Sequence, residues 1–103
     1  MQKIEEKIQV SLVVRLKAKK GMGTKLEQAA IKLIPLTRAE PGCIEYNFHV
    51  SLQEPDSFLF YENWTDQIAL DKHLKMPYLV EFKSLLDEIL QEPPEFTFWN
   101  MQN

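Results

Sequence analysis

His73 is the residue best suited to acid–base chemistry in this chain of 103 residues. Its spacing from Ala69 predicts that the imidazole lies on the apolar side of a short helix. A neutral imidazole there can accept a proton near neutral pH. The same position suits a buried histidine that hydrogen-bonds to a backbone carbonyl and orients the helix. The residue pattern therefore leaves two roles open, general base and structural histidine.

Glu62 and Trp64 are two residues apart on a predicted strand, so their side chains point to the same face of the sheet. The indole could form an apolar wall and donate a hydrogen bond, and the carboxylate could be the partner of His73 or of a substrate hydroxyl. A carboxylate on an apolar face is costly unless it is paired. A structural pair with Arg38, or a hydrogen bond to the N-terminus of the following helix, would satisfy Glu62 equally well.

Other residue patterns point away from bound cofactors. Cys43 follows Gly42 at the start of a strand, where no helix N-terminus lowers the pKa of a thiol, so we expect a packed residue and not a nucleophile. No Cys/His cluster has the spacing of metal ligands, and no flavin, nicotinamide or phosphate-binding glycine motif is present. The sequence therefore predicts neither a metal nor a cofactor.

The period of the apolar residues predicts the elements that position these side chains. Alternation predicts strands over residues 8–17, 44–50, 57–64 and 96–101, and helical spacing predicts helices over residues 24–37, 65–75 and 77–89. Thr24 is the expected N-cap of the first helix and Thr65 that of the second, with Ile68 among the residues facing inward. Pro77 should start the third helix, which carries Leu79, Phe82, Leu85, Leu86 and Ile89 at helical spacing. Of these, Leu79, Phe82, Leu86 and Ile89 should be buried.

The order β-α-β-β-α-α-β predicts an α+β fold of the ferredoxin-like kind, with an antiparallel sheet and the helices on one face. Residues 57–64 are apolar on both faces of their strand. A second apolar sheet face should not remain exposed. Packing it against the same face of an identical chain gives a homodimer, the dimeric α+β barrel.

Composition limits the classes of partner. The formal net charge is −3, which offers no basic patch for nucleic acid. No apolar run approaches the ~20 residues that span a bilayer. The single cysteine and the absence of a signal-peptide pattern indicate the cytoplasm. We expect one domain over residues 1–103, with the polar residues 1–7 as an N-terminal extension.

The spacing of several residues together resembles a known family. Arg38-x-Glu40-x-Gly42-Cys43-x-x-Tyr46 is followed by Glu62-x-Trp64, and His73 comes nine residues later. This order resembles the antibiotic biosynthesis monooxygenase domain family, whose members are small ferredoxin-like dimers and include cofactor-independent oxygenases of quinols and anthrones. In this family the corresponding His borders the pocket.

The resemblance implies a cofactor-independent monooxygenase that acts with O2 on a small electron-rich aromatic such as a hydroquinone or anthrone. A deprotonated polyphenol can reduce O2 itself, so the protein needs only a base, a dry cavity and orientation. His73 would be the base and Glu62 would orient it, while Trp64, Tyr46 and Phe98 would shape the pocket. Two alternatives remain: a proton-transfer isomerase on a small metabolite, and a small-molecule-binding dimer without turnover.

Overall fold

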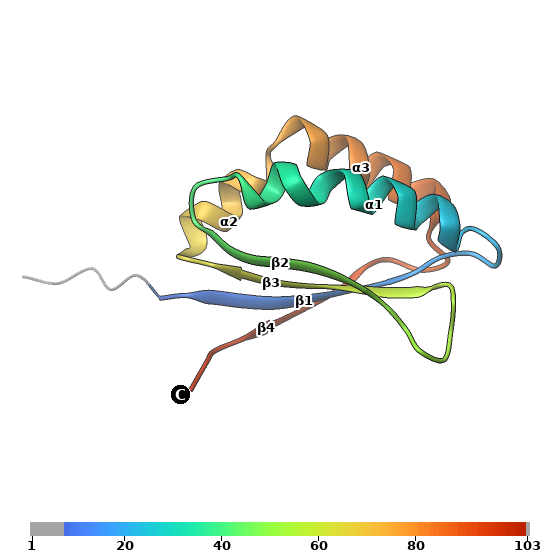
Figure 1. The fold of residues 1–103 in the computed structure, drawn as a ribbon, viewed down its shortest axis with the longest axis horizontal. Coiled ribbons are helices and arrows are strands. Elements are labelled where there is room, and N and C mark those ends of the chain that lie inside the picture. Colours follow the sequence, from blue (N-terminus) through green and yellow to red (C-terminus); the bar gives the residue numbers. More distant parts are fainter. Residues whose placement is uncertain (1–7, 103) are drawn as a thin grey trace, which may run out of the picture.

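Four strands and three helices make up the part of the chain that the structure, a computed structural model, describes, which is residues 8–102; the expected extension at residues 1–7 lies outside it. In chain order the elements are β1 (Val10–Lys17), α1 (Gly23–Arg38), β2 (Cys43–Val50), β3 (Ser57–Trp64), α2 (Gln67–Leu74), α3 (Pro77–Ile89) and β4 (Glu95–Trp99). The strands form one antiparallel sheet in the order β2-β3-β1-β4, and all three helices cover the same face (Figure 1). The predicted ferredoxin-like α+β fold is confirmed.

The core lies between the helix layer and the sheet. Alternate residues of β1 point into it, and Leu12, Val14 and Leu16 are all buried, as the period of two predicts. Helix α3 begins at Pro77 as expected and buries Leu79, Phe82, Leu86 and Ile89, with Leu85 half-buried. The hydrophobic periods therefore identified the residues of both layers that face each other.

The predicted N-caps of two helices are wrong. α1 begins at Gly23, whose N–H donates to Asp56 of the β2–β3 loop at 3.0 Å, and the N–H of Gly21, in the turn before the helix, donates to the same carboxylate at 3.2 Å. Thr24 therefore lies inside the helix. In α2 the N-cap is Asp66, one residue after Thr65, and its carboxylate accepts the N–H of Ala69 at 2.9 Å.

Two further details differ from the sequence prediction. Ile68 is 65% exposed, because the inward face of α2 is formed by Ala69, Leu70 and His73. The last strand, β4, ends at Trp99 and not at residue 101. β4 pairs only with β1, so it is an edge strand, and the helix-facing side chains Phe96 and Phe98 remain 48% and 60% exposed.

The sheet face opposite the helices has an apolar centre beside a buried polar group. Val13, Leu59 and Tyr61 are half-buried there, and His49 is exposed on the same face. Asn63 is fully buried; its amide donates to Glu45 at 2.5 Å and its oxygen accepts from Ser11. This face therefore carries both apolar surface and a fixed polar network.

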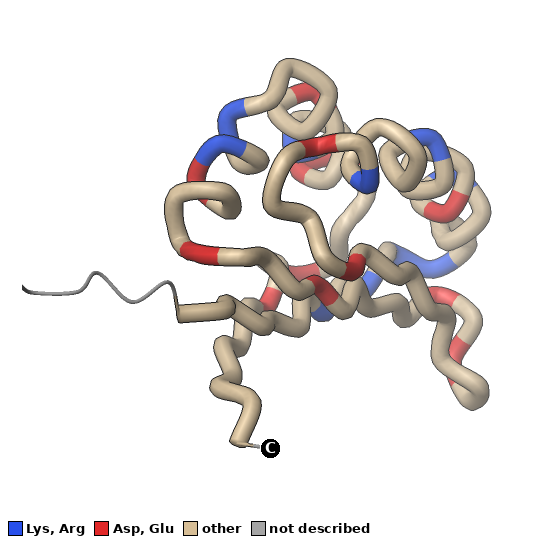
Figure 2. Tube along the Cα trace, turned by 60° about the vertical axis from the view of Figure 1, so that its left-hand side comes forward, with Lys and Arg blue, Asp and Glu red and all other residues tan. Residues whose placement is uncertain are grey.

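Charged residues are interspersed over the molecule. Figure 2 shows Lys and Arg distributed among Asp and Glu along the helices and the sheet. Within residues 8–102, no helix has the length and apolar character that crossing a membrane requires.

Candidate active site

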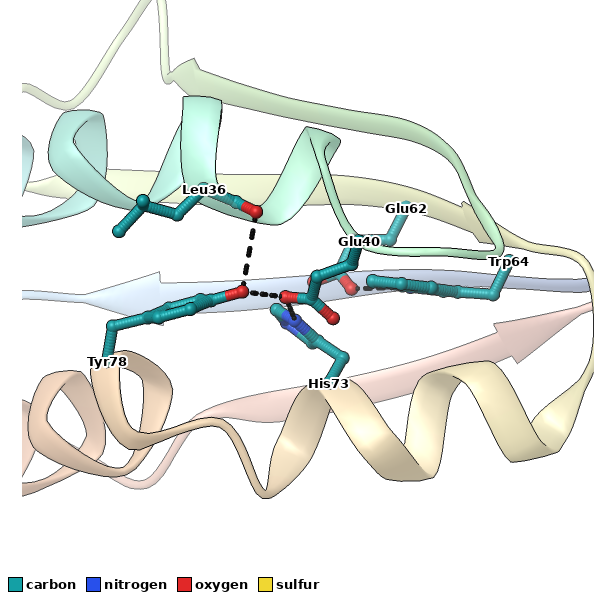
Figure 3. Close-up of polar contacts among 6 residues, drawn as sticks. All are labelled: Leu36, Glu40, Glu62, Trp64, His73 and Tyr78. Carbon is teal, nitrogen blue, oxygen red and sulfur yellow. Dashed lines mark hydrogen bonds and ion pairs between the residues drawn. The ribbon is translucent and has the colours of Figure 1, made fainter.

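A histidine–carboxylate pair lies at the centre of the site. His73, on the inward face of α2, is 1% exposed, and its Nδ1 is 2.9 Å from Oε2 of Glu40 (Figure 3). An ionised carboxylate can only accept a hydrogen bond, so Nδ1 carries the proton and Nε2 is left with its lone pair. The pair thus fixes the tautomer in which Nε2 can act as a base.

Glu40 reaches His73 because the turn that carries it packs directly on α2. The turn needs Gly42, whose φ of +89° is the left-handed conformation that favours glycine. A Cβ on Gly42 would lie 2.5 Å from the Cβ of Ala69, so only glycine permits this close approach. The carbonyl of Gly42 also accepts the N–H of Thr65 at 2.8 Å, which ties the turn to the end of β3.

A second carboxylate holds the indole beside the imidazole. Glu62 and Trp64 point to the helix side of β3, as predicted, and Glu62 accepts the indole N–H at 3.0 Å. The Trp64 ring lies 4.7 Å from the His73 ring between centroids, with an angle of 33° between the planes. The proposed pairing of Glu62 with His73 is wrong, and so is its pairing with Arg38. The partner of His73 is Glu40. Arg38 instead donates to the backbone carbonyl of Tyr46 and to the side-chain oxygen of Asn47.

Burial dominates the electrostatics of the site. It lowers the pKa of His73 below 6.5, against the opposing effect of the hydrogen bond to Glu40, so the imidazole is neutral at neutral pH. Burial likewise raises the pKa of Glu62 to about 7, although the hydrogen bond from Trp64 opposes this. The pKa of Cys43 rises to about 11, mainly through burial and then through the charge of Glu40, which leaves the thiol protonated as expected of a packed residue.

An apolar cavity of about 300 Å³ lies between α3 and the sheet, next to this cluster. Tyr46 contributes to its wall and also contacts His73 edge-on, with 5.5 Å between ring centroids. Leu74, the neighbour of His73 on α2, lines the cavity as well. The exposed lining residues place its opening between α3 and β4: Lys83, Asp87 and Phe96.

Phe98 is the one predicted site residue that the structure keeps apart from the others. The strand register places Tyr46, Glu62, Leu12 and Phe98 in one row on the helix side of the sheet. Phe98 lies at the far end of this row, two strands from Glu62 and hence roughly 10 Å away. The cavity is lined by Phe96 instead.

Sequence reasoning missed Glu40 and Tyr78. The sequence pattern includes Glu40 in the family motif but gives it no role at the site, and it does not single out Tyr78. Tyr78, in the first turn of α3, donates its hydroxyl to the same Oε2 of Glu40 (Figure 3). The available signal was the position of Glu40 inside the Arg38-x-Glu40-x-Gly42 motif.

The fold and this buried centre define a small ferredoxin-like α+β protein with a histidine–carboxylate site under its helices. The sequence model described as antibiotic biosynthesis monooxygenase matches residues 9–85. The chain therefore belongs to the antibiotic biosynthesis monooxygenase family.

Similar proteins occur in several bacteria. An uncharacterized protein of Synechocystis is 40% identical over 65 residues, which are 63% of this chain but only 44% of that protein's length. A Mycobacterium tuberculosis protein named as a candidate monooxygenase is 28% identical over 88 residues, 85% of this chain and 86% of that protein. A solved structure from Shewanella oneidensis is 30% identical, with a TM-score of 0.86 over 93% of each chain.

Proposed function

We propose that this protein is a cofactor-independent monooxygenase that oxidises a small electron-rich aromatic, of the hydroquinone or anthrone kind, with O2. The observation that carries the proposal is the neutral, buried His73, whose Nδ1–H is held by Glu40 so that Nε2 is the basic nitrogen. Membership of the family and similarity to the mycobacterial candidate monooxygenase support oxygenase chemistry.

Oxygenation of such a substrate requires little from the protein beyond a base and a dry cavity. Nε2 of His73 takes the proton of a substrate hydroxyl, and the resulting phenolate is reducing enough to pass an electron to O2. For a hydroquinone, hydroxylation of the ring supplies two electrons and oxidation to the quinone supplies two more. One oxygen atom enters the ring and the other leaves as water. The substrate thus provides all four electrons that O2 requires.

Each neighbour of His73 has a defined part in this proposal. Glu40 orients the imidazole, the part that the sequence suggested for Glu62. Glu62 holds the indole of Trp64 against the imidazole, and a rigid apolar wall excludes water. Tyr46 lies between the imidazole and the cavity, where it would meet the substrate first. Phe96 takes the lining role expected of Phe98.

The volume of the cavity limits the substrate. An apolar protein cavity of about 150 Å³ is large enough to bind benzene. The cavity here is about twice that size, at about 300 Å³. It therefore favours hydroquinones of one or two rings over an anthrone of three.

Oxygen uptake tests the proposal. A panel of one-, two- and three-ring hydroquinones and anthrones is incubated with the protein, and O2 consumption is followed above the rate of spontaneous autoxidation. With 18O2, one labelled oxygen atom should appear in the product. Product that forms equally well without O2 would contradict oxygenation and indicate an isomerase.

One observation favours a second function, the binding of a small molecule without turnover. His73 is 1% exposed and is not among the residues that line the cavity, so a ligand there does not touch the imidazole unless Tyr46 or Leu74 moves. Saturable binding of a hydroquinone analogue to a protein that consumes no O2 with any member of the panel would support this function.

We also propose that the protein forms a homodimer through the open face of its sheet. The apolar centre at Val13, Leu59 and Tyr61 supports this, because such surface is rarely left in water. Leu59→Glu should split the dimer, since an unpaired charge in a dry interface costs several kcal/mol. Val80→Glu places the same charge on the outer side of α3, at a residue 51% exposed, and should not. Light scattering that shows a monomer for the unmodified protein at micromolar concentration would contradict the proposal.

A further inference from the structure

Two donors share one oxygen of the buried carboxylate. Oε2 of Glu40 accepts Nδ1–H of His73 and also the hydroxyl of Tyr78 (Figure 3). Glu40 itself is only 8% exposed, so water does not compete for these hydrogen bonds or screen the charge of the carboxylate. The Tyr78 hydroxyl also lies 3.4 Å from the carbonyl of Leu36 near the end of α1, so it links α1, the turn and α3 at one point.

Sharing an oxygen has a chemical consequence for the imidazole. A hydroxyl bonded to a carboxylate oxygen takes up part of the negative charge there, and less of it acts on the second donor. Since imidazolium is stabilised by that charge, a partly shared Glu40 stabilises it less than an unshared carboxylate would. An imidazolium carries a proton on Nε2 and cannot act as a base.

We propose that Tyr78 is a positioning residue that acts on His73 through Glu40. Its hydroxyl takes up part of the negative charge at Oε2, so that His73 remains a neutral base. The proposal rests on the proposed function only in assuming that His73 acts as a base in catalysis. The arrangement itself belongs to the protein without substrate and can be measured there.

Other groups around the imidazole act together with Tyr78 or against it. Burial lowers the pKa of His73 most strongly, and the positive charge of Lys83 on α3 lowers it further. Glu40 raises the pKa by its hydrogen bond and its charge. On the sheet side, the ring of Tyr46 on β2 and the indole bonded to Glu62 on β3 contact the imidazole. Tyr78 is thus placed to moderate Glu40, whose hydrogen bond and charge favour the charged ring.

The titration of the imidazole nitrogens, followed by 15N NMR, tests this inference. The chain has two histidines, and the second, His49, lies exposed on the opposite sheet face, away from Glu40 and Tyr78. In Tyr78→Phe, which removes only the hydroxyl, the pKa of His73 should rise by about one pH unit, equivalent to about 1.4 kcal/mol. Tyr61→Phe, the same change on the open sheet face, should leave the pKa of His73 unchanged.

A second pair of variants separates a charge effect from loss of folding. In Glu40→Gln the negative charge is gone, so the pKa of His73 should fall, and adding Tyr78→Phe to that variant should no longer raise it. An unchanged or lowered pKa of His73 in Tyr78→Phe would overturn the inference. So would an equal rise in the presence of Glu40→Gln. If Tyr78→Phe does not fold, Glu40→Gln decides alone. An unchanged or raised pKa of His73 in Glu40→Gln then overturns the inference.

Turnover gives an independent readout. With a responsive hydroquinone, the pH at which kcat is half-maximal should rise with the pKa in Tyr78→Phe, while the plateau at high pH and the KM are retained. A merely structural role would lower the amount of folded protein without moving that pH. If no hydroquinone is turned over, the proposed function fails, while the NMR titration still decides the inference about Tyr78.

Discussion

Replacing Phe82 with alanine would enlarge a cavity that the molecule already has. Phe82 is 6% exposed, contacts Phe60 edge-on with 6.1 Å between ring centroids, and lines the cavity under α3. Truncation of a buried Phe costs ~3–5 kcal/mol. Because part of the Phe82 ring faces the cavity, its removal loses fewer contacts than removal of a ring packed on all sides. We therefore expect a loss of about 3 kcal/mol, a large share of the ~5–15 kcal/mol that stabilises a typical domain.

Urea unfolding at one fixed protein concentration measures this loss, since any association makes stability depend on concentration. Phe98→Ala is the matched control: the same change at a residue 60% exposed should cost about 1 kcal/mol or less. A loss below about 1 kcal/mol for Phe82→Ala would show that α3 does not pack on the sheet as described. Equal losses in the two variants would contradict the assignment of Phe98 to the exposed edge.

Two further predictions concern pH and the turn beneath α2. Burial raises the pKa of Glu62 from 4.5 to about 7, so the folded protein binds this proton more tightly than the unfolded chain. The contribution of Glu62 to stability therefore falls as pH rises from about 4.5 to about 7. Glu62→Gln should remove this decline when stability is measured by urea unfolding at several pH values. A decline that persists in Glu62→Gln would show that another group causes it. Gly42→Ala should lower the stability in thermal unfolding by ~2–5 kcal/mol, because it combines strain at φ +89° with a contact at 2.5 Å. Gly21→Ala, at φ +83° with no atom within 4 Å, should cost only ~1–2 kcal/mol, and equal losses would show that the turn is not pressed against α2.

The faces of the strands and helices could be predicted because they depend on local periodicity. Residues 57–64 form β3 with the predicted bounds, and Glu62 and Trp64 share its helix side. His73 faces inward for the same reason, since the helical period fixes it relative to Ala69. These side chains meet because each element places its apolar face in the single core.

Contacts between residues far apart in the sequence could not be predicted in this way. Asp56 caps α1 from 33 residues away from Gly23, whereas local sequence predicts Thr24 as the N-cap, which is wrong. Glu40 meets His73 across the same separation, and only the packing of the turn on α2 brings them together. The distance of Phe98 from the site depends on the order of the strands, which alternation does not specify.

The central claim is that His73 performs the proton chemistry, and turnover compared with stability in two variants tests it most directly. His73→Ala should lower the turnover of a responsive hydroquinone by ~10²–10⁴ in a folded protein. His73→Gln should lose nearly as much, because an amide can hydrogen-bond to Glu40 but cannot accept a proton at neutral pH. Near-normal turnover per folded molecule in His73→Gln, with a lowered melting temperature in both variants, would show that His73 is structural and contradict the account.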